Sequence, residues 1–254
     1  RTVSSAASDV YKRQLFDRVI HLSTAQATDP VLAKEPFSAL ERRAVLGLAS
    51  LYCLRMLGLF DRPALATSLK ALWTGDPIPN LTEPLIDLTE AQRNITLRRL
   101  GKAGLLTVNR SPAGELLSID AHPLLREYFA KQLRRPDQAK RRSGKDEPED
   151  AGAPSLRSSI RPTETSEVWR AAHRRLYEHL CETTDEGDQP TLEQLQPLYQ
   201  AVAHGCHAGL VQDAWKKVYR QRVIRNREFY SIHRLGAFAS DLGALACFFE
   251  QLWT

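Results

Sequence analysis

His122 directly precedes Pro123, at the point where an apolar helical pattern begins. Proline is favoured in the first turn of a helix, so His122 is predicted to cap a helix N-terminus. This end of a helix attracts anions and favours the neutral imidazole, whose N–H can donate to a phosphate oxygen. Two interpretations stay open, a phosphate contact or a cap that pairs with Asp120 or the backbone. The residues alone favour the cap.

His204 and His207 stand one helical turn apart in the segment His204-Gly205-Cys206-His207. Two histidines at this spacing can share a metal ion, but a structural metal site usually needs four well-placed donors. The pattern therefore favours ordinary helix residues over a metal site.

Basic side chains collect on one predicted helix and on the hairpin that follows it: Arg93, Arg98, Arg99, Lys102 and Arg110. Such a face can meet DNA phosphates or an acidic partner, and the alternative is a solvated helix face. Glu90 opens the helix where its first residues should approach the bases, and the aliphatic run around Leu97 leaves few long polar side chains for base edges. The pattern therefore disfavours DNA binding, which stays the alternative function.

The common catalytic signatures are missing from the sequence. It contains no G-x-x-x-x-G-K-[ST] phosphate loop, no G-x-S-x-G elbow, no H-E-x-x-H helix and no paired C-x-x-C. We expect no complete catalytic site and no cofactor held by this chain alone.

The elements expected over residues 36–133 follow the order of a winged-helix domain. An apolar helix over 40–60 precedes a helix capped by Asp61, and a capping-box pattern starts a third helix near Glu90. Two β-prone runs then form a hairpin, the wing, and a helix from Pro123 to Leu133 closes the domain. The predicted fold class is mainly α.

Two further segments follow. Residues 134–167 are charged and rich in Ser and Pro without apolar periodicity, which predicts a disordered linker. Apolar residues recur at helical spacing over 168–254, which predicts antiparallel helical hairpins of a superhelical, tetratricopeptide-like type.

The composition is that of a globular protein, with 43% hydrophobic and 26% charged residues and no apolar run long enough for a membrane span. The four well-separated cysteines predict reduced thiols in a cytoplasmic protein. The net charge of +5 is weak evidence for a nucleic-acid partner, because much of the excess lies in the linker.

The two ends of the sequence suggest a fragment. Residues 1–14 are similar to a translated sequencing-adaptor string, and residues 15–35 form a short lead-in from a preceding module. At the other end an apolar helical pattern stops without a polar terminator, so the helical domain is expected to be truncated.

Three segments of the predicted domain resemble bacterial signal-transducing ATPases of the NB-ARC/NACHT type. They are Leu57-Gly58-Leu59-Phe60-Asp61-Arg62-Pro63-Ala64, Leu81-Thr82-Glu83-Pro84-Leu85 and Asp120-Ala121-His122-Pro123-Leu124-Leu125-Arg126-Glu127-Tyr128-Phe129. Segments in the helical region after the linker resemble the same proteins: Arg174-Arg175-Leu176-Tyr177-Glu178-His179-Leu180, Pro197-Leu198-Tyr199-Gln200-Ala201-Val202-Ala203-His204-Gly205-Cys206 and Asn226-Arg227-Glu228-Phe229-Tyr230-Ser231.

The resemblance implies a regulatory role. In that family a winged helix locks the ADP-bound, closed state of an upstream P-loop ATPase, and downstream repeats sense a protein or other trigger. It implies ADP or ATP with Mg²⁺ as cofactor of a full-length parent, the upstream ATPase module as partner and an oligomer on activation.

The same resemblance gives His122 a role, because the family's M-H-D-like motif touches the ADP β-phosphate through its histidine. Ala121-His122-Pro123 occupies the matching place, with Pro123 instead of the acidic residue. The substitution removes a carboxylate and a backbone N–H, so only the histidine's role carries over.

Overall fold

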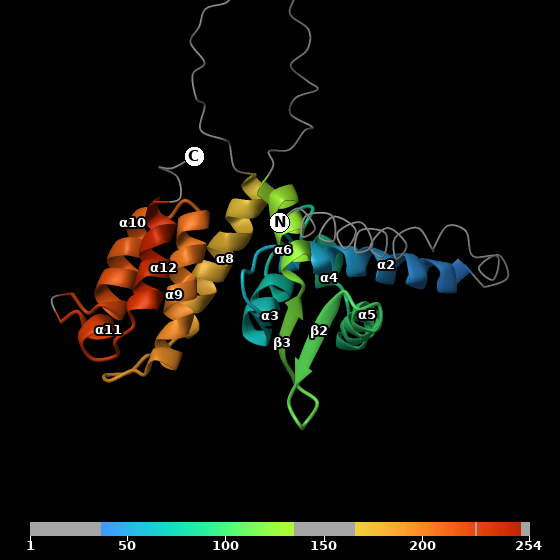
Figure 1. The fold of residues 1–254 in the computed structure, drawn as a ribbon. Coiled ribbons are helices and arrows are strands. Elements are labelled where there is room, and N and C mark those ends of the chain that lie inside the picture. The colour runs from blue at the N-terminus through green and yellow to red at the C-terminus, as the bar shows by residue number, and fades with distance from the viewer. Residues whose placement is uncertain (1–36, 135–165, 227, 250–254) are drawn as a thin grey trace, which may run out of the picture.

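The computed structural model of the chain describes residues 37–134, 166–226 and 228–249. They form a mainly helical protein with one small antiparallel sheet (Figure 1). The expectations for residues 1–14 and 15–35, and those for 135–165 of the predicted linker, lie outside the described residues. Across the described ranges no helix combines the length and the apolar character that crossing a membrane would require.

The first part of the chain surrounds the sheet with helices. Its elements are α2 (Phe37–Leu57), β1 (Ala64–Leu65), α3 (Ala66–Thr74), α4 (Glu83–Ile86), α5 (Glu90–Lys102), β2 (Leu106–Arg110), β3 (Leu116–Ala121) and α6 (Pro123–Arg134). The strand order is β1-β3-β2, and Val108 pairs with Ile119 across the predicted hairpin. The hairpin and the helix that follows it are confirmed.

The capping box at the start of α5 is also confirmed. The backbone N–H of Gln92 donates to Thr89 Oγ1 at 3.3 Å, and the N–H of Thr89 donates to Gln92 Oε1 at 2.8 Å. Gly104, with φ at +68°, then turns the chain from α5 toward the hairpin, in the left-handed conformation that glycine adopts without strain.

The predicted start of the second helix is wrong. Asp61 does not cap it, because Ala64 and Leu65 form strand β1 opposite Ile119 and Ser118 of β3. Helix α3 therefore begins only at Ala66 and has no side-chain cap. The local signals at Asp61 and Pro63 could not reveal this, since the strand exists only through its pairing with residues more than fifty positions away.

The second part of the chain is entirely helical. Its elements are α8 (Glu167–Thr183), α9 (Leu192–His207), α10 (Val211–Asp213), η2 (Ala214–Val223), α11 (Tyr230–His233) and α12 (Phe238–Phe249). One element differs from the α-helices expected over 168–254. Element η2 is a π-helix, in which N–H groups bond to the carbonyl five residues earlier. The N–H of Ile224 continues this pattern beyond its end, donating to Tyr219 O at 2.9 Å.

Arg222 joins η2 to the end of α8. Its guanidinium forms two hydrogen bonds with the Glu186 carboxylate, at 2.9 and 2.6 Å, and donates to the carbonyls of Cys181 and Thr184. The hydrogen bond from Arg222 lowers the pKa of the Glu186 carboxyl below its usual value. The pair is partly buried, so it is less exposed to screening by salt than a surface ion pair.

Asp241 of α12 joins four helical elements. Its Oδ1 accepts hydrogen bonds from the hydroxyls of Tyr199 and Tyr219, both at 3.1 Å, and from Ser231 at 3.2 Å. The side chain is only 3% exposed, so Oδ1 needs these donors, whereas the buried Oδ2 has no hydrogen-bond partner. One carboxylate oxygen thereby links α9, η2, α11 and α12.

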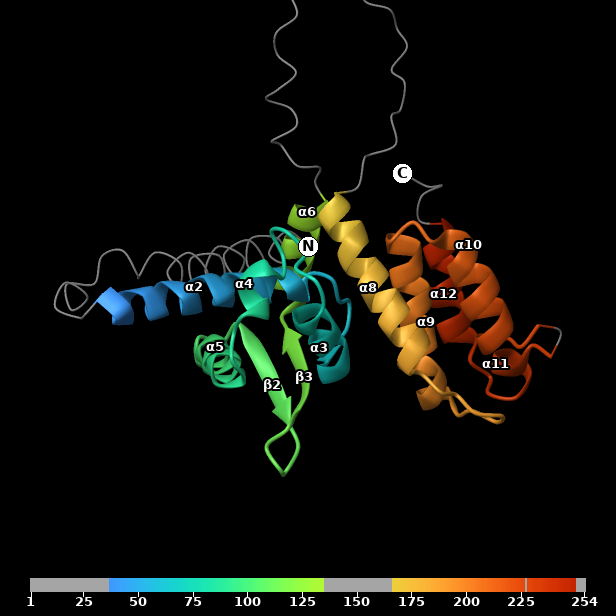
Figure 2. The same ribbon diagram turned by 180° about the vertical axis from the view of Figure 1, so that it is seen from behind.

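Helix α8 lies between the two parts in both views (Figures 1 and 2). Trp169, Ala172 and Leu176 belong to the core of the first part, whereas Tyr177 and Leu180 belong to the core of the second. The two sets follow one another along the helix, the first from Trp169 to Leu176 and the second from Tyr177 to Leu180, so one helix contributes to both cores. The boundary expected at residue 168 therefore falls at the beginning of a helix that both cores share.

The residues on either side of 135–165 lie next to each other. The N–H of Ser166 donates to Arg134 O at 3.3 Å, and the Arg134 guanidinium lies 4.6 Å from the Trp169 ring centroid. The distance between the end of α6 and the start of α8 is thus one that a short connection can span.

We predict that a linker of about four glycine and serine residues can replace residues 135–165 without loss of folding. Thermal unfolding of both proteins should give Tm values within about 2 °C of each other, which corresponds to less than about 1 kcal/mol in a protein of this size. A larger drop in Tm would show that the replaced residues contribute to the core.

Candidate functional site

His122 lies at the junction between β3 and α6. Its Nδ1 accepts a hydrogen bond from the backbone N–H of Leu124 at 3.2 Å, so the predicted capping role is confirmed. Because Nδ1 acts as an acceptor, the proton of the neutral ring is on Nε2. The side chain is exposed to solvent.

The backbone N–H groups that follow His122 are already engaged. Pro123 has no N–H, the N–H of Leu124 bonds to the imidazole, and those of Leu125 and Arg126 donate to the carbonyl of His122 at 2.9 and 3.2 Å. The first turn of α6 thus has its donors occupied from within. Any anion recognition at this point would depend on the imidazole rather than on a cluster of backbone amides.

Asp120 has partners on both sides of His122. Its Oδ1 accepts from the N–H of Ala121 at 2.9 Å and lies 3.2 Å from Nη1 of Arg126. This ion pair ties the end of β3 to the first turn of α6. It fixes the backbone on both sides of His122.

The five basic residues of the predicted partner face separate into two groups. Arg93 donates to Ile86 O at 3.2 Å, and its guanidinium lies 5.4 Å from the Trp73 ring centroid. Its side chain is therefore engaged in contacts within the first part of the chain. Arg110 donates to Asn94 Oδ1 at 2.7 Å and to Gly114 O at 2.8 Å, which fixes the hairpin loop against α5.

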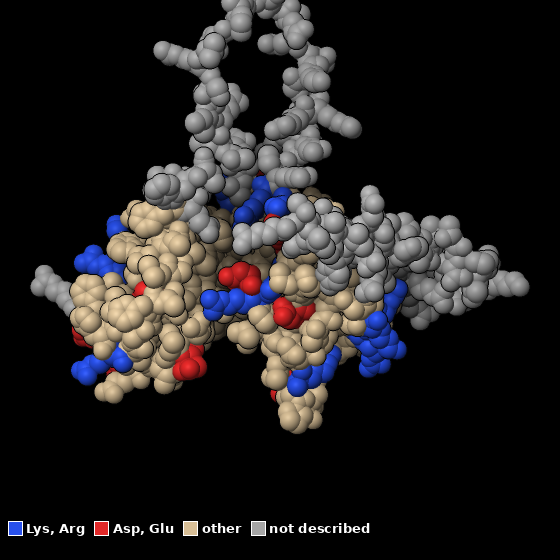
Figure 3. Space-filling view, in the orientation of Figure 1, with Lys and Arg blue, Asp and Glu red and all other residues tan. Residues whose placement is uncertain are grey.

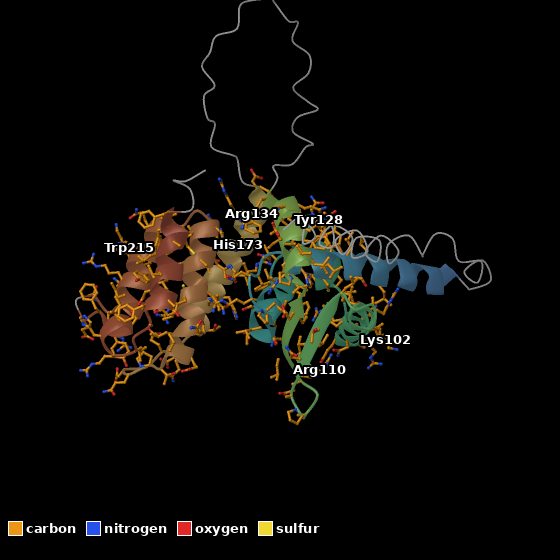
Figure 4. All side chains as sticks on the ribbon, viewed as in Figure 1. Lys102, Arg110, Tyr128, Arg134, His173 and Trp215 are labelled. Atoms are coloured by element: carbon orange, nitrogen blue, oxygen red, sulfur yellow. The ribbon has the colours of Figure 1, made fainter. Side chains whose placement is uncertain are left out.

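The other three basic residues remain at the surface of α5. Arg98 and Lys102 are exposed and Arg99 is half-buried. Figure 3 shows positive charge gathered over α5 and the neighbouring hairpin, and Figure 4 places Lys102 and Arg110 on this side of the molecule. Ile95 is 45% exposed on the same helix, so the basic surface has an aliphatic side chain within it.

His204 and His207 belong to a histidine cluster between α8 and α9. Nδ1 of His204 lies 2.8 Å from Nδ1 of His173, and the rings of His173 and His207 are 4.9 Å apart between centroids. Sequence reasoning missed His173, although it stands one turn after Trp169 on α8, because nothing local pairs it with a residue 31 positions later. Among the described residues, no group of three or more potential ligands has the arrangement of a metal site.

The cluster also touches the first part of the chain. Phe60 meets His204 edge to face with centroids 6.0 Å apart, and Trp169 lies against His173 at 4.1 Å and His207 at 5.5 Å. Figure 4 shows His173 at this junction, with Arg134 close to the adjoining ends of α6 and α8. The histidines are therefore part of the packing between the two cores.

Burial keeps His173 and His204 neutral. It lowers the pKa of His204 to about 3, with a further contribution from the charge of His207. Burial, followed by the charges of His204, His207 and Arg134, lowers the pKa of His173 well below its usual value. We assign the shared proton to Nδ1 of His173, because its buried Nε2 has no hydrogen-bond partner and a bare lone pair costs less there than an unpaired N–H.

One groove, of about 400 Å³, lies between α8 and the start of η2. Its lining carries charges of both signs, from Arg174 and Lys217 on one hand and Glu178, Glu182 and Asp213 on the other. Such a lining selects no single ligand charge, and His122 does not contribute to it.

Comparison of the chain with protein-family models, with curated proteins and with solved structures gives no match.

The histidine cluster predicts acid-dependent stability. An unfolded histidine has a pKa near 6.5, and the folded values are lower, so the stabilisation is complete above pH 6.5 and is lost as the pH falls below it. We expect the free energy of unfolding to fall by on the order of 1 kcal/mol per pH unit for each buried histidine.

Urea unfolding between pH 7.5 and 5 measures this slope. The variant His204→Phe should flatten it, whereas the matched variant His233→Phe, at an exposed position on α11, should leave it as in the wild type. Equal slopes in wild type and His204→Phe would rule out the cluster as the source.

Proposed function

We propose that this chain is the latch and sensor base of an ATP/ADP-switched signal-transducing NTPase. In this proposal residues 36–133 form a winged-helix domain that holds the ADP-bound state of an upstream ATPase module closed. The helices after residue 167 form the first of a series of superhelical, tetratricopeptide-like hairpins that receive the trigger. The observation that carries the proposal is the position and protonation geometry of His122.

Several features support a latch. The helix–hairpin–helix order from α5 to α6 is compatible with a winged helix, and His122 follows the second hairpin strand directly. Since Nδ1 of His122 accepts the Leu124 N–H, its Nε2 is the nitrogen with a proton to offer to a phosphate. The ion pair between Asp120 and Arg126 fixes the flanking backbone, which limits the entropy cost of presenting the ring.

The nucleotide itself would be held mainly by the upstream module. His122 would add one hydrogen bond to the closed state, and a ligand shifts a two-state equilibrium only by its difference in affinity for the two states. One hydrogen bond to a charged group contributes about 1.5–3 kcal/mol, which corresponds to a change of roughly tenfold or more in the ratio of closed to open states. A contribution of this size favours the closed state but still allows the winged helix to open when the nucleotide is exchanged.

The shared helix α8 supports the sensor role. A movement of the downstream helices would act on the first part through α8, because Trp169 and Leu176 pack in the first core while Tyr177 and Leu180 pack in the second. Arg175 adds a polar contact at 3.4 Å to the carbonyl of Leu72 in α3. The proposed trigger thus has a direct mechanical path to the proposed latch.

We predict that the variant His122→Asn, made in the full-length parent protein, distinguishes the two roles of His122, the helix cap and the nucleotide contact. Asparagine is a good N-cap, so the folded stability should be retained, whereas the imidazole N–H is lost. The off-rate of fluorescent ADP should rise roughly tenfold, and basal signalling should rise with it. His233→Asn is the matched control and should leave the ADP off-rate as in the wild type.

An unchanged ADP off-rate in His122→Asn would contradict the latch proposal. If stability falls in the same variant while the off-rate is unchanged, His122 acts as a helix cap alone. Both quantities can be measured on the same protein preparation.

A second candidate, binding of double-stranded DNA, is favoured by one observation, the basic surface of α5 with Arg98, Arg99 and Lys102 (Figure 3). The engaged side chains of Arg93 and Arg110 reduce the number of cations that can reach phosphates. If the chain acts as a latch and does not bind DNA, it should not retard a DNA duplex in a gel-shift series, even at about 50 mM salt. Retardation that is lost in Arg98→Glu but kept in Arg174→Glu would instead support the DNA candidate.

A further inference from the structure

The histidine cluster of His173, His204 and His207 lies where the first part of the chain contacts α9. His173 of α8 and His204 of α9 are joined through their Nδ1 atoms at 2.8 Å. Phe60 of the first part touches His204, and Trp169, which belongs to the first core, touches His173 and His207. The cluster is therefore part of the contact that positions α9 on the first part.

The surroundings of the cluster oppose a positive charge. The charges that act on His173 come from His204, His207 and Arg134, and each of these groups is positive when protonated. His207 acts in the same way on His204. Nε2 of His173 is buried without a hydrogen-bond partner, so a proton added there gains no acceptor. A proton on the cluster is thus both desolvated and repelled.

The hydrogen bond between His173 and His204 also depends on the protonation state. Two neutral rings offer the one donor and the one acceptor that this bond needs. One added proton can occupy Nε2 of His173 while the bond persists. A second must occupy the acceptor Nδ1 of His204, which leaves two N–H groups facing each other across 2.8 Å. Full protonation therefore breaks the contact.

Two further polar contacts between the parts do not change in mildly acidic solution. Arg62 donates to Gln196 Oε1 at 3.0 Å, and Arg175 donates to a carbonyl of α3 at 3.4 Å. Arginine stays protonated between pH 5 and 7.5, and amide and carbonyl groups do not titrate. The acidic groups that act on Arg175, Asp76 and Glu178, stay ionised in this range. Acid therefore acts on this junction through the histidines rather than through these contacts.

The packing of α9 on the C-terminal half of α8 is of another kind. Tyr177 and Leu180 belong to the second core, and a Cβ on Gly205 would stand 2.9 Å from Cδ2 of Tyr177, so α9 approaches α8 closely at this point. Separation of the histidines would leave this contact in place. It would part the C-terminal end of α9 from Phe60 and Trp169.

We propose that the histidine cluster is an acid-sensitive switch, whose protonation separates the C-terminal end of α9 from the first part of the chain while the helices persist. A histidine that becomes exposed to solvent binds protons below about pH 6.5, so acid favours the separated form. Between pH 7.5 and pH 5 the ratio of separated to closed molecules should rise about thirtyfold for each histidine released, or roughly a thousandfold for His173 and His204 together. The inference does not rest on the latch proposal, because neither His122 nor a nucleotide takes part.

Pulsed electron paramagnetic resonance of the full chain measures the separation. Spin labels on Lys102→Cys of α5 and Gln212→Cys of α10, both exposed positions, report the distance between the parts in a Cys181→Ser, Cys247→Ser background. We expect one distance distribution at pH 7.5 and a second one that grows as the pH falls to 5, with the far-ultraviolet circular dichroism of the folded protein throughout. A second distribution that grows only in step with loss of helix would overturn the inference, because it would report global unfolding.

Two substitutions assign the response to the cluster. His204→Gln keeps an acceptor for the N–H of His173 but does not titrate, so the response should fall to about thirtyfold. The double variant His173→Gln, His204→Gln should lose most of it, whereas His233→Gln, at an exposed position on α11, should respond as the wild type does. A wild-type distribution at pH 7.5 would show that each variant is folded. A single distribution for the wild type at every pH, or a full response in the double variant, would overturn the inference.

Discussion

The packing of α8 into both cores is the constraint on which the rest of the structure depends. Trp169, Ala172 and Leu176 complete one core, and Tyr177 and Leu180 complete the other. Each fully buried large apolar side chain contributes about 1.5–3 kcal/mol, so this single helix contributes to the stability of both cores at once. The two parts are therefore coupled through a shared helix, and the contact of Phe60 with His204 adds to this coupling.

Polar groups with defined partners fix the helices that this apolar packing brings together. The Asp241 carboxylate receives three hydroxyl donors, and the His173–His204 pair shares one hydrogen bond between two neutral rings. Loss of these bonds would leave Asp241 Oδ1 or a ring nitrogen unpaired as well, at a cost of about 1–3 kcal/mol, in addition to Asp241 Oδ2 and His173 Nε2, which have no partner. The bonds select one packing of α8, α9, η2 and α12 over other packings with similar apolar burial.

Local signals allowed the elements of the first part to be predicted, and their limits have physical causes. The capping box at Thr89 and the cap at His122 depend on residues within three positions, so the sequence reveals them. Strand β1, the role of His173 and the engagement of Arg110 with Asn94 depend on contacts between distant segments, which no local pattern contains. For the candidate site, the sequence identified His122 as a cap, whereas its tautomer followed only from the bond to Leu124.

The π-helical geometry of η2 has a consequence for how the chain can vary. Relative to an α-helix, such a segment accommodates additional backbone in the same length, which shifts the side chains that follow it around the axis. Trp215 can thereby face Phe248 of α12 while Arg222, further along, reaches Glu186 beyond the end of α8. Deletion of one residue between them would rotate one of these side chains about the helix axis relative to the other. Both contacts therefore depend on the length of this helix as well as on its residue types.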